Sequence, residues 1–582
     1  MRGTRNIFPE RGAASKEPGG RVPVALLWPG SYASGMSSLG FLSIYTIINS
    51  RTDSLCERFF FSPNERALSY ENRRPLKAFP IIAGSLSLEN DYWIFPRIVS
   101  NGGINPFRFN RMGDYQGTQE EPLVIAGGVG PWSNPWPIAP FADIIFTGEG
   151  EVPWEKFLDL LWEDNFWDLT KPEQIKLLLT HIPGTFSLLT LPKTLKNPKD
   201  PQEFREALDN FPPVKPAILS YPFAEERIPP HSPINTLNTE FSGTQLIEIS
   251  RGCPYGCRFC LAGFLYRPHR AWDLEKILKT LKSPNPWDPL NPPFSDTSPV
   301  GLVSPAVADH PNFYELLNTL IQEGRKVSFS SLRLSALTLE IATLLGKGKI
   351  RGVAVAPEGG SQRIRDSINK NLDLHTILEA VKILSLGGLR SLKLYFMLGL
   401  PGETPDDLNE IGNLSKEILK HAKGQKNAPQ ITVSVANFTP KPHTPLEDAP
   451  LLSEKDLEAK GQFLKKVFRN LPGIKLQLDP PRWTMIQGLL ARGGPESSQL
   501  VTNLFNFAGK GKISLENYDD YIKSPLFHPE SPLYLRPWRV ILPNAQVNFL
   551  NLEKDRALSG LLTPPCPPGL GCGRCGACSP VD

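Results

Sequence analysis

Short apolar runs alternate with amphipathic stretches through the middle of the chain. Six of these runs read as buried strands, and they begin at or near residues 247, 301, 326, 350, 391 and 430. Helices are expected between them over residues 271–283, 312–324, 338–348 and 374–388. In the last of these, four apolar side chains fall on one helix face and two glycines follow to end the helix.

This alternation predicts parallel βα units. Six such units fit a partial (β/α)6 barrel of the TIM type over residues 241–450. In such barrels the reacting groups stand at the carboxyl ends of the strands. The groups expected there are the cysteine-bearing loop 251–260, Ser304, Ser330, Arg333, Glu358 and the turn 399–403.

The first third of the chain shows a second alternation. Residues 21–30 read as strand and turn, 38–49 as helix, and 79–103 as strand, loop and helix. Residues 121–161 read as strand, glycine-rich turn, short strand, acidic turn and helix. The pattern predicts a doubly wound, Rossmann-like α/β domain over 21–165.

The remaining segments are harder to read. Residues 166–240 are expected to be a linker region. An amphipathic helix and a strand–helix pair past residue 450 predict a small α+β C-terminal domain over 451–560, followed by a Cys-rich tail over 561–582. Residues 1–20 are charged and lack an apolar segment, which predicts a disordered tail.

The composition is that of a globular protein of several domains: 40% of the 582 residues are hydrophobic and 21% are charged. The net charge of +4 argues against a strong sequence-independent grip on nucleic acid, although a local basic patch is compatible with it. No apolar run reaches the roughly 20 residues that span a bilayer, and the first residues do not form a signal peptide. A cytoplasmic protein without membrane attachment is therefore expected.

Seven of the eight cysteines fall in two clusters, and clustered thiols in such a chain indicate metal binding or catalysis rather than disulfides. Cys253, Cys257 and Cys260 have C-x3-C-x2-C spacing. Three thiolates on one loop can hold three corners of an iron–sulfur cluster and leave one iron open. A closed zinc site needs a fourth ligand, for which His269 is the nearby candidate.

This first cluster, with Phe259 directly before its last cysteine, resembles the signature of the radical S-adenosylmethionine (SAM) superfamily. The resemblance implies that the three thiolates hold a [4Fe–4S] cluster whose fourth iron is chelated by the amino and carboxylate groups of SAM, with Phe259 near the cofactor. One electron then cleaves SAM to methionine and a 5′-deoxyadenosyl radical, which abstracts a hydrogen atom. A partial barrel is the core expected of this superfamily.

The same resemblance implies further SAM contacts. Ser304 and Ala306 stand where the family contacts the amino group, although the usual GGE signature is absent there. Ser330 and Arg333 are expected at the ribose and the carboxylate, since a planar guanidinium suits a carboxylate. Glu358 is expected at a ribose hydroxyl or the amino group. Two of these residues have an alternative structural role that involves no cofactor. Arg333 would pair with an acidic side chain elsewhere, and Glu358 would cap the following helix.

Residues 126–135 and 141–151 resemble the cobalamin-binding-type domain that precedes the barrel in many radical SAM enzymes. The resemblance implies cobalamin at Gly127, Gly128, Gly148, Glu149 and Gly150. The DxHxxG motif is missing, because the matching turn 31–40 contains no histidine, so any cobalamin binds without a histidine ligand. The alternative is a degenerate domain whose glycines form tight turns and which binds nothing or only helps to bind substrate.

The second cysteine cluster ends the chain. Its four members have C-x5-C-x2-C-x2-C spacing and are Cys566, Cys572, Cys575 and Cys578. The C-x2-C-x2-C part resembles the cysteine run of bacterial ferredoxins, which favours an auxiliary [4Fe–4S] cluster. Structural zinc is the second interpretation, and a disordered redox-active tail is the third.

Over residues 22–578 the arrangement resembles a bacterial family of radical SAM proteins with a cobalamin-type N-terminal domain and a cysteine-rich tail. Related enzymes methylate unreactive carbons, or thiolate or otherwise modify tRNA or ribosomal components. The resemblance implies modification of an RNA, protein or small-molecule substrate, with an electron donor such as flavodoxin or ferredoxin. Two other classes stay open: a metal-stapled RNA-binding protein with zinc in both clusters, and a cobalamin or electron-transfer accessory protein without radical chemistry.

Overall fold

The computed structural model describes residues 8–63, 65–111, 121–163, 165–196, 200–282, 285, 287–288, 291–423, 429–507, 535–567 and 572–578. The chain forms two compact units, each assembled from segments that are separate in the sequence. Unit 1 comprises Met1–Gly243, Ser283–Pro293 and Leu489–Leu542, and unit 2 comprises Thr244–Lys282, Phe294–Gly488 and Pro543–Asp582. Among the described residues, no helix has both the length and the apolar character needed to cross a membrane.

Unit 1 is built on a six-stranded sheet of order β2-β1-β3-β4-β5-β6. Its strands are β1 (Val22–Trp28), β2 (Ser54–Phe60), β3 (Ile81–Ser85), β4 (Leu123–Gly127), β5 (Ile144–Phe146) and β6 (Thr185–Phe186). The first five are parallel, and β6 is antiparallel to β5. The strand order reverses direction between β1 and β3, which is the topology of a doubly wound fold. The predicted α/β class is confirmed.

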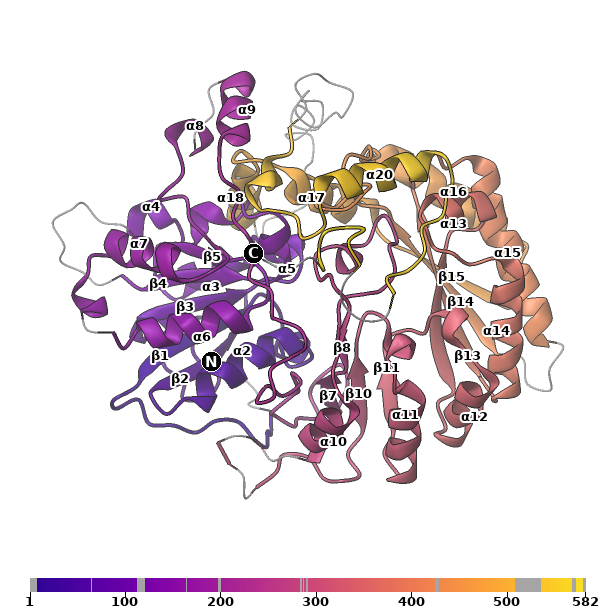
Figure 1. Ribbon diagram of the computed structural model, residues 1–582, viewed down its shortest axis with the longest axis horizontal. Coiled ribbons are helices and arrows are strands. Elements are labelled where there is room, and N and C mark those ends of the chain that lie inside the picture. The colour runs from indigo at the N-terminus through magenta and orange to yellow at the C-terminus, as the bar shows by residue number, and fades with distance from the viewer. Residues whose placement is uncertain are drawn as a thin grey trace. The chain divides into compact units, whose positions relative to one another are not determined.

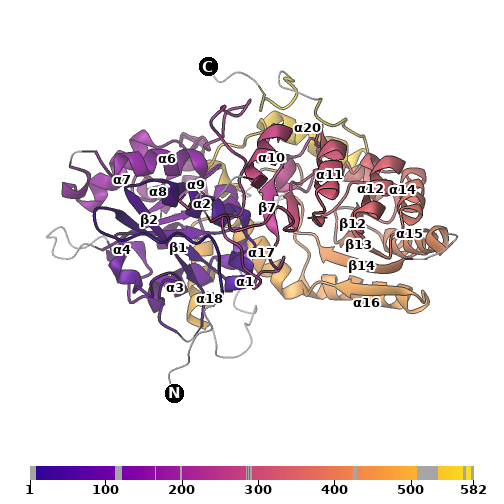
Figure 2. The same cartoon turned by 90° about the horizontal axis from the view of Figure 1, so that it is seen from below.

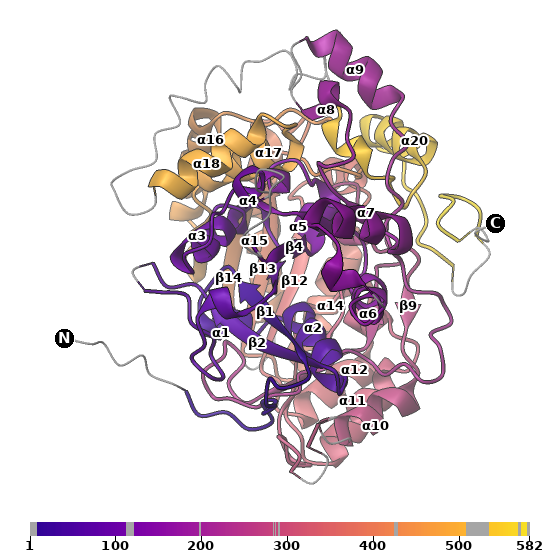
Figure 3. The same cartoon turned by 90° about the vertical axis from the view of Figure 1, so that its left-hand side faces the viewer.

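Helices cover both faces of this sheet, as expected for parallel strands that read as continuous apolar runs. The helices of unit 1 are α1 (Tyr32–Gly35), α2 (Leu39–Ser50), α3 (Ile94–Asn101), α4 (Arg108–Arg111), α5 (Val129–Ser133), α6 (Glu151–Leu160), α7 (Lys171–His181), α8 (Lys193–Lys196), α9 (Pro201–Asp209) and α18 (Ser497–Phe507). Figure 2 shows α2 and α6 on one face and α3 with α18 on the other. Figure 3 shows the same layers from the side.

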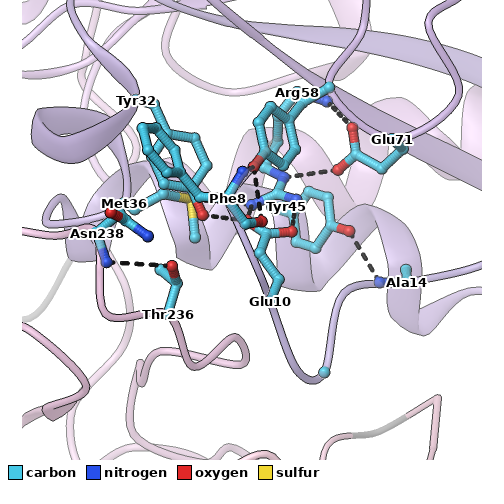
Figure 4. Close-up of polar contacts among 12 residues, drawn as sticks. Phe8, Glu10, Ala14, Tyr32, Met36, Tyr45, Arg58, Glu71, Thr236 and Asn238 are labelled. Carbon is cyan, nitrogen blue, oxygen red and sulfur yellow. Dashed lines mark hydrogen bonds and ion pairs between the residues drawn. The ribbon is translucent and has the colours of Figure 1, made fainter. Parts of the chain in front are cut away.

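The N-terminal segment from residue 8 onward packs on unit 1. Arg58 of β2 is buried between two carboxylates, with 2.7 Å to Glu10 Oε2 and 2.6 Å to Glu71 Oε1 (Figure 4). A buried guanidinium needs paired carboxylates, and Glu10 supplies one of them. The predicted disordered tail over residues 1–20 is therefore wrong for this part of it.

The region predicted as a linker, residues 166–240, belongs to unit 1 and contributes β6 and α7 to α9. Ala217 forms a parallel bridge with Gly148, directly after β5, and Val214 forms another with Ile541. The segment Leu489–Leu542 thus returns to unit 1 from beyond the barrel. No local pattern in the sequence indicated this return, because it depends on pairing between residues far apart in the chain.

The described residues of unit 2 form seven parallel strands in two sheets, of order β11-β10-β7 and β12-β13-β14-β15. They are β7 (Gln245–Glu248), β10 (Val300–Val303), β11 (Val327–Phe329), β12 (Gly352–Glu358), β13 (Ser391–Leu398), β14 (Gln430–Asn437) and β15 (Ile474–Leu478). The N–H of Leu332, just past β11, donates to the carbonyl of Ala354 in β12 at 3.0 Å and links the two sheets. The first six strands are those predicted, and a partial barrel is confirmed.

Helices line the outside of these strands, as Figure 1 shows for α11, α12, α14 and α15. The helices of unit 2 are α10 (Leu274–Lys282), α11 (Phe313–Gln322), α12 (Leu339–Lys347), α13 (Gln362–Ser367), α14 (Leu374–Leu386), α15 (Pro405–Lys423), α16 (Glu454–Arg469), α17 (Pro481–Arg492) and α20 (Val547–Leu558). On β13, Leu392 and Leu394 are buried, whereas Lys393 and Tyr395 are half-buried. This alternation is typical of a strand with helices on one face only.

The segment 451–560 does not form the separate C-terminal domain that the sequence predicted. Its first part, α16 and β15, adds a seventh strand to the barrel sheet by pairing in parallel with β14. Its middle joins unit 1, and α20 joins unit 2. The edge of β14 offers unpaired backbone groups, and β15 satisfies them.

Candidate functional site

The cysteine loop occupies residues 252–260 and follows β7 and the short strand β8 (Ser250–Arg251), which pairs with β9 (Arg270–Ala271). Gly252 opens the loop at a φ of 76°, and a side chain at this position would collide with the carbonyl oxygen of Tyr266. Glycine tolerates both the positive φ and the close approach. The loop thus leaves the carboxyl end of a parallel barrel strand, where barrel enzymes carry their chemistry.

Two turns gather the three thiols. The N–H of Cys260 donates to the Cys257 carbonyl at 3.0 Å, and the N–H of Gly263 donates to the Cys260 carbonyl at 3.2 Å. The thiols are close enough to interact: burial raises the pKa of Cys253 to about 12, and Cys257 and Cys260 add to the rise. Cys257 is buried and Cys253 and Cys260 are half-buried. Three thiols on one short loop form a donor set that suits an iron–sulfur cluster.

Arg258, between the second and third cysteines, anchors the loop. Its side chain is fully buried and forms an ion pair with Glu553 of α20 at 3.1 Å. It also donates to the carbonyl groups of Asp366 and Ser367 at the end of α13, at 3.1 and 2.8 Å. No local pattern indicated this role, because the partners of the Arg258 side chain lie more than 100 positions away.

Tyr255, between the first two cysteines, joins the loop to two other strand ends. Its hydroxyl donates to Asp309 Oδ1 at 2.5 Å, and the Arg333 guanidinium lies 3.5 Å from its ring centroid. Asp309 Oδ2 is buried and has no hydrogen-bond partner among the described residues. A buried acceptor without a donor is costly, so this oxygen is placed to accept a hydrogen bond from a bound molecule.

Sequence reasoning missed Tyr255 and Asp309. Tyr255 lies inside the cysteine motif, which was a usable signal. Asp309 gave no local signal, because its second oxygen can be recognised as unpaired only from the packing around it.

The structure links Arg333 and Glu358 through Lys370. Arg333 donates to the carbonyl of Lys370 at 2.6 Å, and Lys370 Nζ lies 3.4 Å from Glu358 Oε1. Glu358 ends β12 at a φ of 66° after a shift in strand register. It does not cap the following helix, because the hydroxyl of Ser361 accepts the hydrogen bond from Ile364 N–H.

Three other candidates are placed differently. Ser304 is buried with its hydroxyl 2.6 Å from that of Ser250, and it accepts a hydrogen bond from Ala306 N–H at 3.0 Å. These contacts hold the end of β10 against the start of the cysteine loop. Phe259 is partly buried and packs against a cluster that includes Ile364 and Phe438. Ser330 is exposed after β11.

His269, the candidate fourth zinc ligand, is partly buried beside other cationic groups. Burial, together with His310 and Arg270, lowers the pKa of His269 to about 4. Its Nε2 has no hydrogen-bond partner within the described part of the chain. Across the same residues, no three or more histidine, cysteine, aspartate or glutamate side chains are grouped so as to hold a single metal ion.

The cobalamin candidates of unit 1 are largely engaged by the chain itself. The Glu149 carboxylate accepts a hydrogen bond from Leu219 N–H at 2.8 Å, and a side chain on Gly148 would collide with the backbone of Ala217. Gly128, at a φ of 112°, packs against the Leu86 carbonyl. These three positions therefore contact this chain's own backbone.

The two remaining candidates are Gly127 and Gly150. Gly127 ends β4 beside Phe146, and Gly150 precedes α6 beside the Ile44 side chain. The four tail cysteines are all described, with Cys575 buried at 4% exposure and the others half-buried.

Two family models match the chain in succession. The model for the N-terminal part of radical SAM proteins matches residues 40–186, and the model for the radical SAM superfamily matches residues 247–414. The second range contains the end of β7, the cysteine loop and the four strands β10 to β13.

Sequence relatives extend the similarity. An uncharacterized protein of Methanocaldococcus jannaschii is 27% identical over 480 residues, which cover 82% of this chain and 90% of the relative. An uncharacterized methyltransferase of Pyrococcus horikoshii is 22% identical over 281 residues, 48% of this chain and 54% of the relative.

Among solved structures, the radical SAM methyltransferase TsrM of Kitasatospora setae, in a complex with tryptophan and a SAM analogue, aligns over 71% of this chain and 72% of its own with 13% identity and a TM-score of 0.43. A TM-score of this size is too low to support an inference about function. The two consecutive family matches and the barrel built around the cysteine loop identify the chain as a radical SAM enzyme with an additional N-terminal domain.

Proposed function

We propose that Cys253, Cys257 and Cys260 hold a [4Fe–4S] cluster whose remaining iron binds SAM. The observation that carries this proposal is the position of three thiols on one short loop at the carboxyl end of β7, beside polar side chains that follow β10, β11 and β12. When bound, the cluster and SAM supply one chemistry, the one-electron cleavage of SAM to methionine and a 5′-deoxyadenosyl radical.

The chain's own residues bind and orient the cofactor. Arg333 is held flat by the Tyr255 ring and by the Lys370 carbonyl, and a fixed planar guanidinium suits the carboxylate of SAM. Asp309 Oδ2 has no partner among the described residues, which supports a role as acceptor for an ammonium or hydroxyl group of the bound cofactor. Glu358, paired with Lys370, is placed for a ribose hydroxyl or the amino group.

The reaction to test first is methyl transfer to an unreactive carbon of an RNA, protein or small molecule. The Pyrococcus horikoshii relative is named as an uncharacterized methyltransferase, which supports this choice. Cobalamin does not enter the proposal, because Gly128, Gly148 and Glu149 already hold the chain's own backbone.

The test is anaerobic reconstitution of the full chain, followed by iron, sulfide, zinc and cobalt analysis and a 5′-deoxyadenosine assay with dithionite and SAM. Cys257→Ala is expected to lose about four iron per chain and all deoxyadenosine formation, because three thiolates are needed to hold the cluster. Cys56→Ala, which removes the one cysteine outside both clusters, is the matched control and should keep both.

Zinc at the barrel loop, or a fully loaded protein that leaves SAM intact, would reject this function. The first result would favour the alternative of a metal-stapled binding protein. Cobalt retained in proportion to protein would show that the unit 1 residues rearrange to admit cobalamin.

A further inference from the structure

The cysteine-rich tail lies directly on the barrel's cysteine loop. The N–H of Cys566 donates to the Pro254 carbonyl at 2.7 Å, and Pro254 follows Cys253 in the chain. From standard backbone dimensions, the Cα atoms of Cys253 and Cys566 are therefore no more than about 10 Å apart. The first cysteine of one cluster is thus a near neighbour of the first cysteine of the other.

A buried asparagine ties the two segments together a second time. Asn369 Nδ2 donates to the Gly256 carbonyl in the cysteine loop at 3.1 Å, and Asn369 Oδ1 accepts from Thr563 N–H in the tail at 2.9 Å. Asn369 is 3% exposed, so both bonds are shielded from water. A side chain that satisfies both segments fixes their spacing, which is more than a loosely attached tail requires.

The far end of the tail is held by α20 and the segment before it. The N–H of Gln546 donates to the Cys575 carbonyl at 2.9 Å, and Cys575 is buried with Phe264 and Phe549. The Arg267 guanidinium lies over both rings, 4.8 and 5.2 Å from their centroids. Figure 1 shows α20 running beside α13, at the end of which the cysteine loop is anchored.

Three of the four tail thiols lie near enough for their charges to act on one another. The charges of Cys572 and Cys575 interact with Cys566, and the positive charge of Arg267 interacts with both Cys566 and Cys572. Cys575 is buried toward the barrel, whereas Gly573 and Arg574 next to Cys572 are exposed. The group therefore has one side against the cysteine loop and another side at the surface of unit 2.

We propose that Cys566, Cys572, Cys575 and Cys578 hold a second [4Fe–4S] cluster that relays electrons to the barrel cluster. The relay rests on the proposed function, since it needs a redox-active centre at Cys253, Cys257 and Cys260. A low-potential one-electron donor protein, such as reduced flavodoxin, is oxidised at the exposed side. The same electron passes to the barrel cluster, so the tail cluster returns to its starting state and the electron cleaves one S–C5′ bond of SAM.

This assignment explains why the tail is docked where it is. Electron transfer between two metal centres weakens steeply with their separation, so a relay must lie against the centre that it serves. A structural zinc site would stabilise the tail equally well at any position on the barrel. The backbone contact with the residue next to Cys253 therefore favours an electron-transfer cluster over a structural zinc site.

The experiment compares the reconstituted full chain, the Cys572→Ser/Cys575→Ser variant and the Cys56→Ala control. The control and the unaltered chain should each carry about eight iron, and the double variant about four. Deoxyadenosine formation is measured with reduced flavodoxin and with dithionite, a small reductant that does not need a docking surface. The rate with flavodoxin divided by the rate with dithionite should fall by about tenfold or more in the double variant.

Zinc in the tail, unchanged iron in the double variant, or an unchanged rate ratio despite lost iron would each overturn the relay. Cys578→Ser is a second variant with the same expected results, and circular dichroism shows whether either variant is folded. If the unaltered chain holds eight iron but leaves SAM intact, the proposed function fails. The relay is then judged by electron paramagnetic resonance, from the rate at which flavodoxin reduces the barrel cluster with and without the tail cysteines.

Discussion

At the scale of single residues, the side chains around the cysteine loop have different kinds of partner. Arg258 is buried and satisfied by Glu553 and backbone carbonyls of the chain, so it holds the loop. Arg333 stacks on Tyr255, and the neighbouring Asp309 keeps one buried oxygen without a partner among the described residues. The second arrangement leaves hydrogen-bonding capacity for a ligand, and the first does not.

The Arg333→Lys variant tests the role of the planar guanidinium. Lysine keeps the charge but loses the stacking and the fork geometry. We expect iron content to stay the same and the KM for SAM to rise about tenfold or more, because a hydrogen bond to a charged group contributes roughly 1.5–3 kcal/mol. Arg351→Lys is the matched control, since Arg351 is an exposed arginine of the same unit. An unchanged KM in Arg333→Lys would remove Arg333 from the SAM site.

Asp91 predicts a pH dependence of stability in unit 1. Its carboxylate accepts from Ser87 N–H and Leu88 N–H, yet burial raises the pKa of Asp91 from 3.8 to about 6. The folded state therefore binds the proton more tightly than the unfolded state does. The stabilising contribution is complete below about pH 4 and is lost as the pH rises through 6.

The Asp91→Asn variant should remove this part of the pH dependence. Its unfolding free energy minus that of the unaltered chain should increase from pH 4 to pH 7, by on the order of 1 kcal/mol once partial exposure is allowed for. Urea titrations at four pH values measure the difference. A difference that is flat with pH would show that Asp91 titrates normally.

At the scale of elements, glycines decide how closely the loops after the strands approach one another. Gly128 joins β4 to α5 at a φ of 112° and lies against the Leu86 carbonyl after β3. The sequence showed a pair of glycines here, and both a ligand and a tight turn were compatible with it. The structure shows the tight turn, because a side chain at this position would collide with the Leu86 carbonyl.

Gly128→Ala is expected to destabilise unit 1 by about 1–3 kcal/mol or more, because alanine is strained at this φ and its Cβ meets backbone atoms. Gly19→Ala is the matched control, with no atom within 4 Å of the added carbon, and should change stability little. Thermal melts of both variants measure the effect. Equal melting temperatures would mean that the loop after β4 shifts at little cost.

At the scale of the whole molecule, the two units are interleaved in sequence. Asn134 of unit 1 donates to the carbonyl groups of Leu490, Ala491 and Gly493, at 3.2, 3.1 and 2.8 Å. Trp136 donates to the Pro537 carbonyl at 2.7 Å. Unit 1 is therefore completed by a segment that the chain makes after the barrel.

A fragment of residues 1–243 should therefore not fold by itself. Asn134 and Trp136 are buried in the full chain. The fragment lacks the carbonyl groups that accept their hydrogen bonds. We expect strong binding of a hydrophobic dye and loss of near-ultraviolet circular dichroism, with the full chain as control. A cooperative melt of the fragment would show that the returning segment is dispensable.

Local patterns were sufficient for much of the fold. The six barrel strands and most of their helices were predicted because buried parallel strands are continuous apolar runs and their helices have one apolar face. The disordered N-terminal tail and the single C-terminal domain were wrong predictions, and both errors have the same cause. Glu10 and β15 acquire structure from partners that are distant in the chain, Arg58 and β14.

Strand and helix periods and cysteine spacing are local properties, so the order of residues was enough to specify a mixed α/β protein with three thiols on one barrel loop. Only the tertiary structure shows which polar groups lie next to that loop and which glycines contact neighbouring backbone. It also shows that the tail cysteines lie against the cysteine loop of the barrel. These features depend on contacts such as Asn369 with Thr563 and Cys566 with Pro254. Such contacts arise when the folded backbone closes long loops, and no local pattern of residues encodes them.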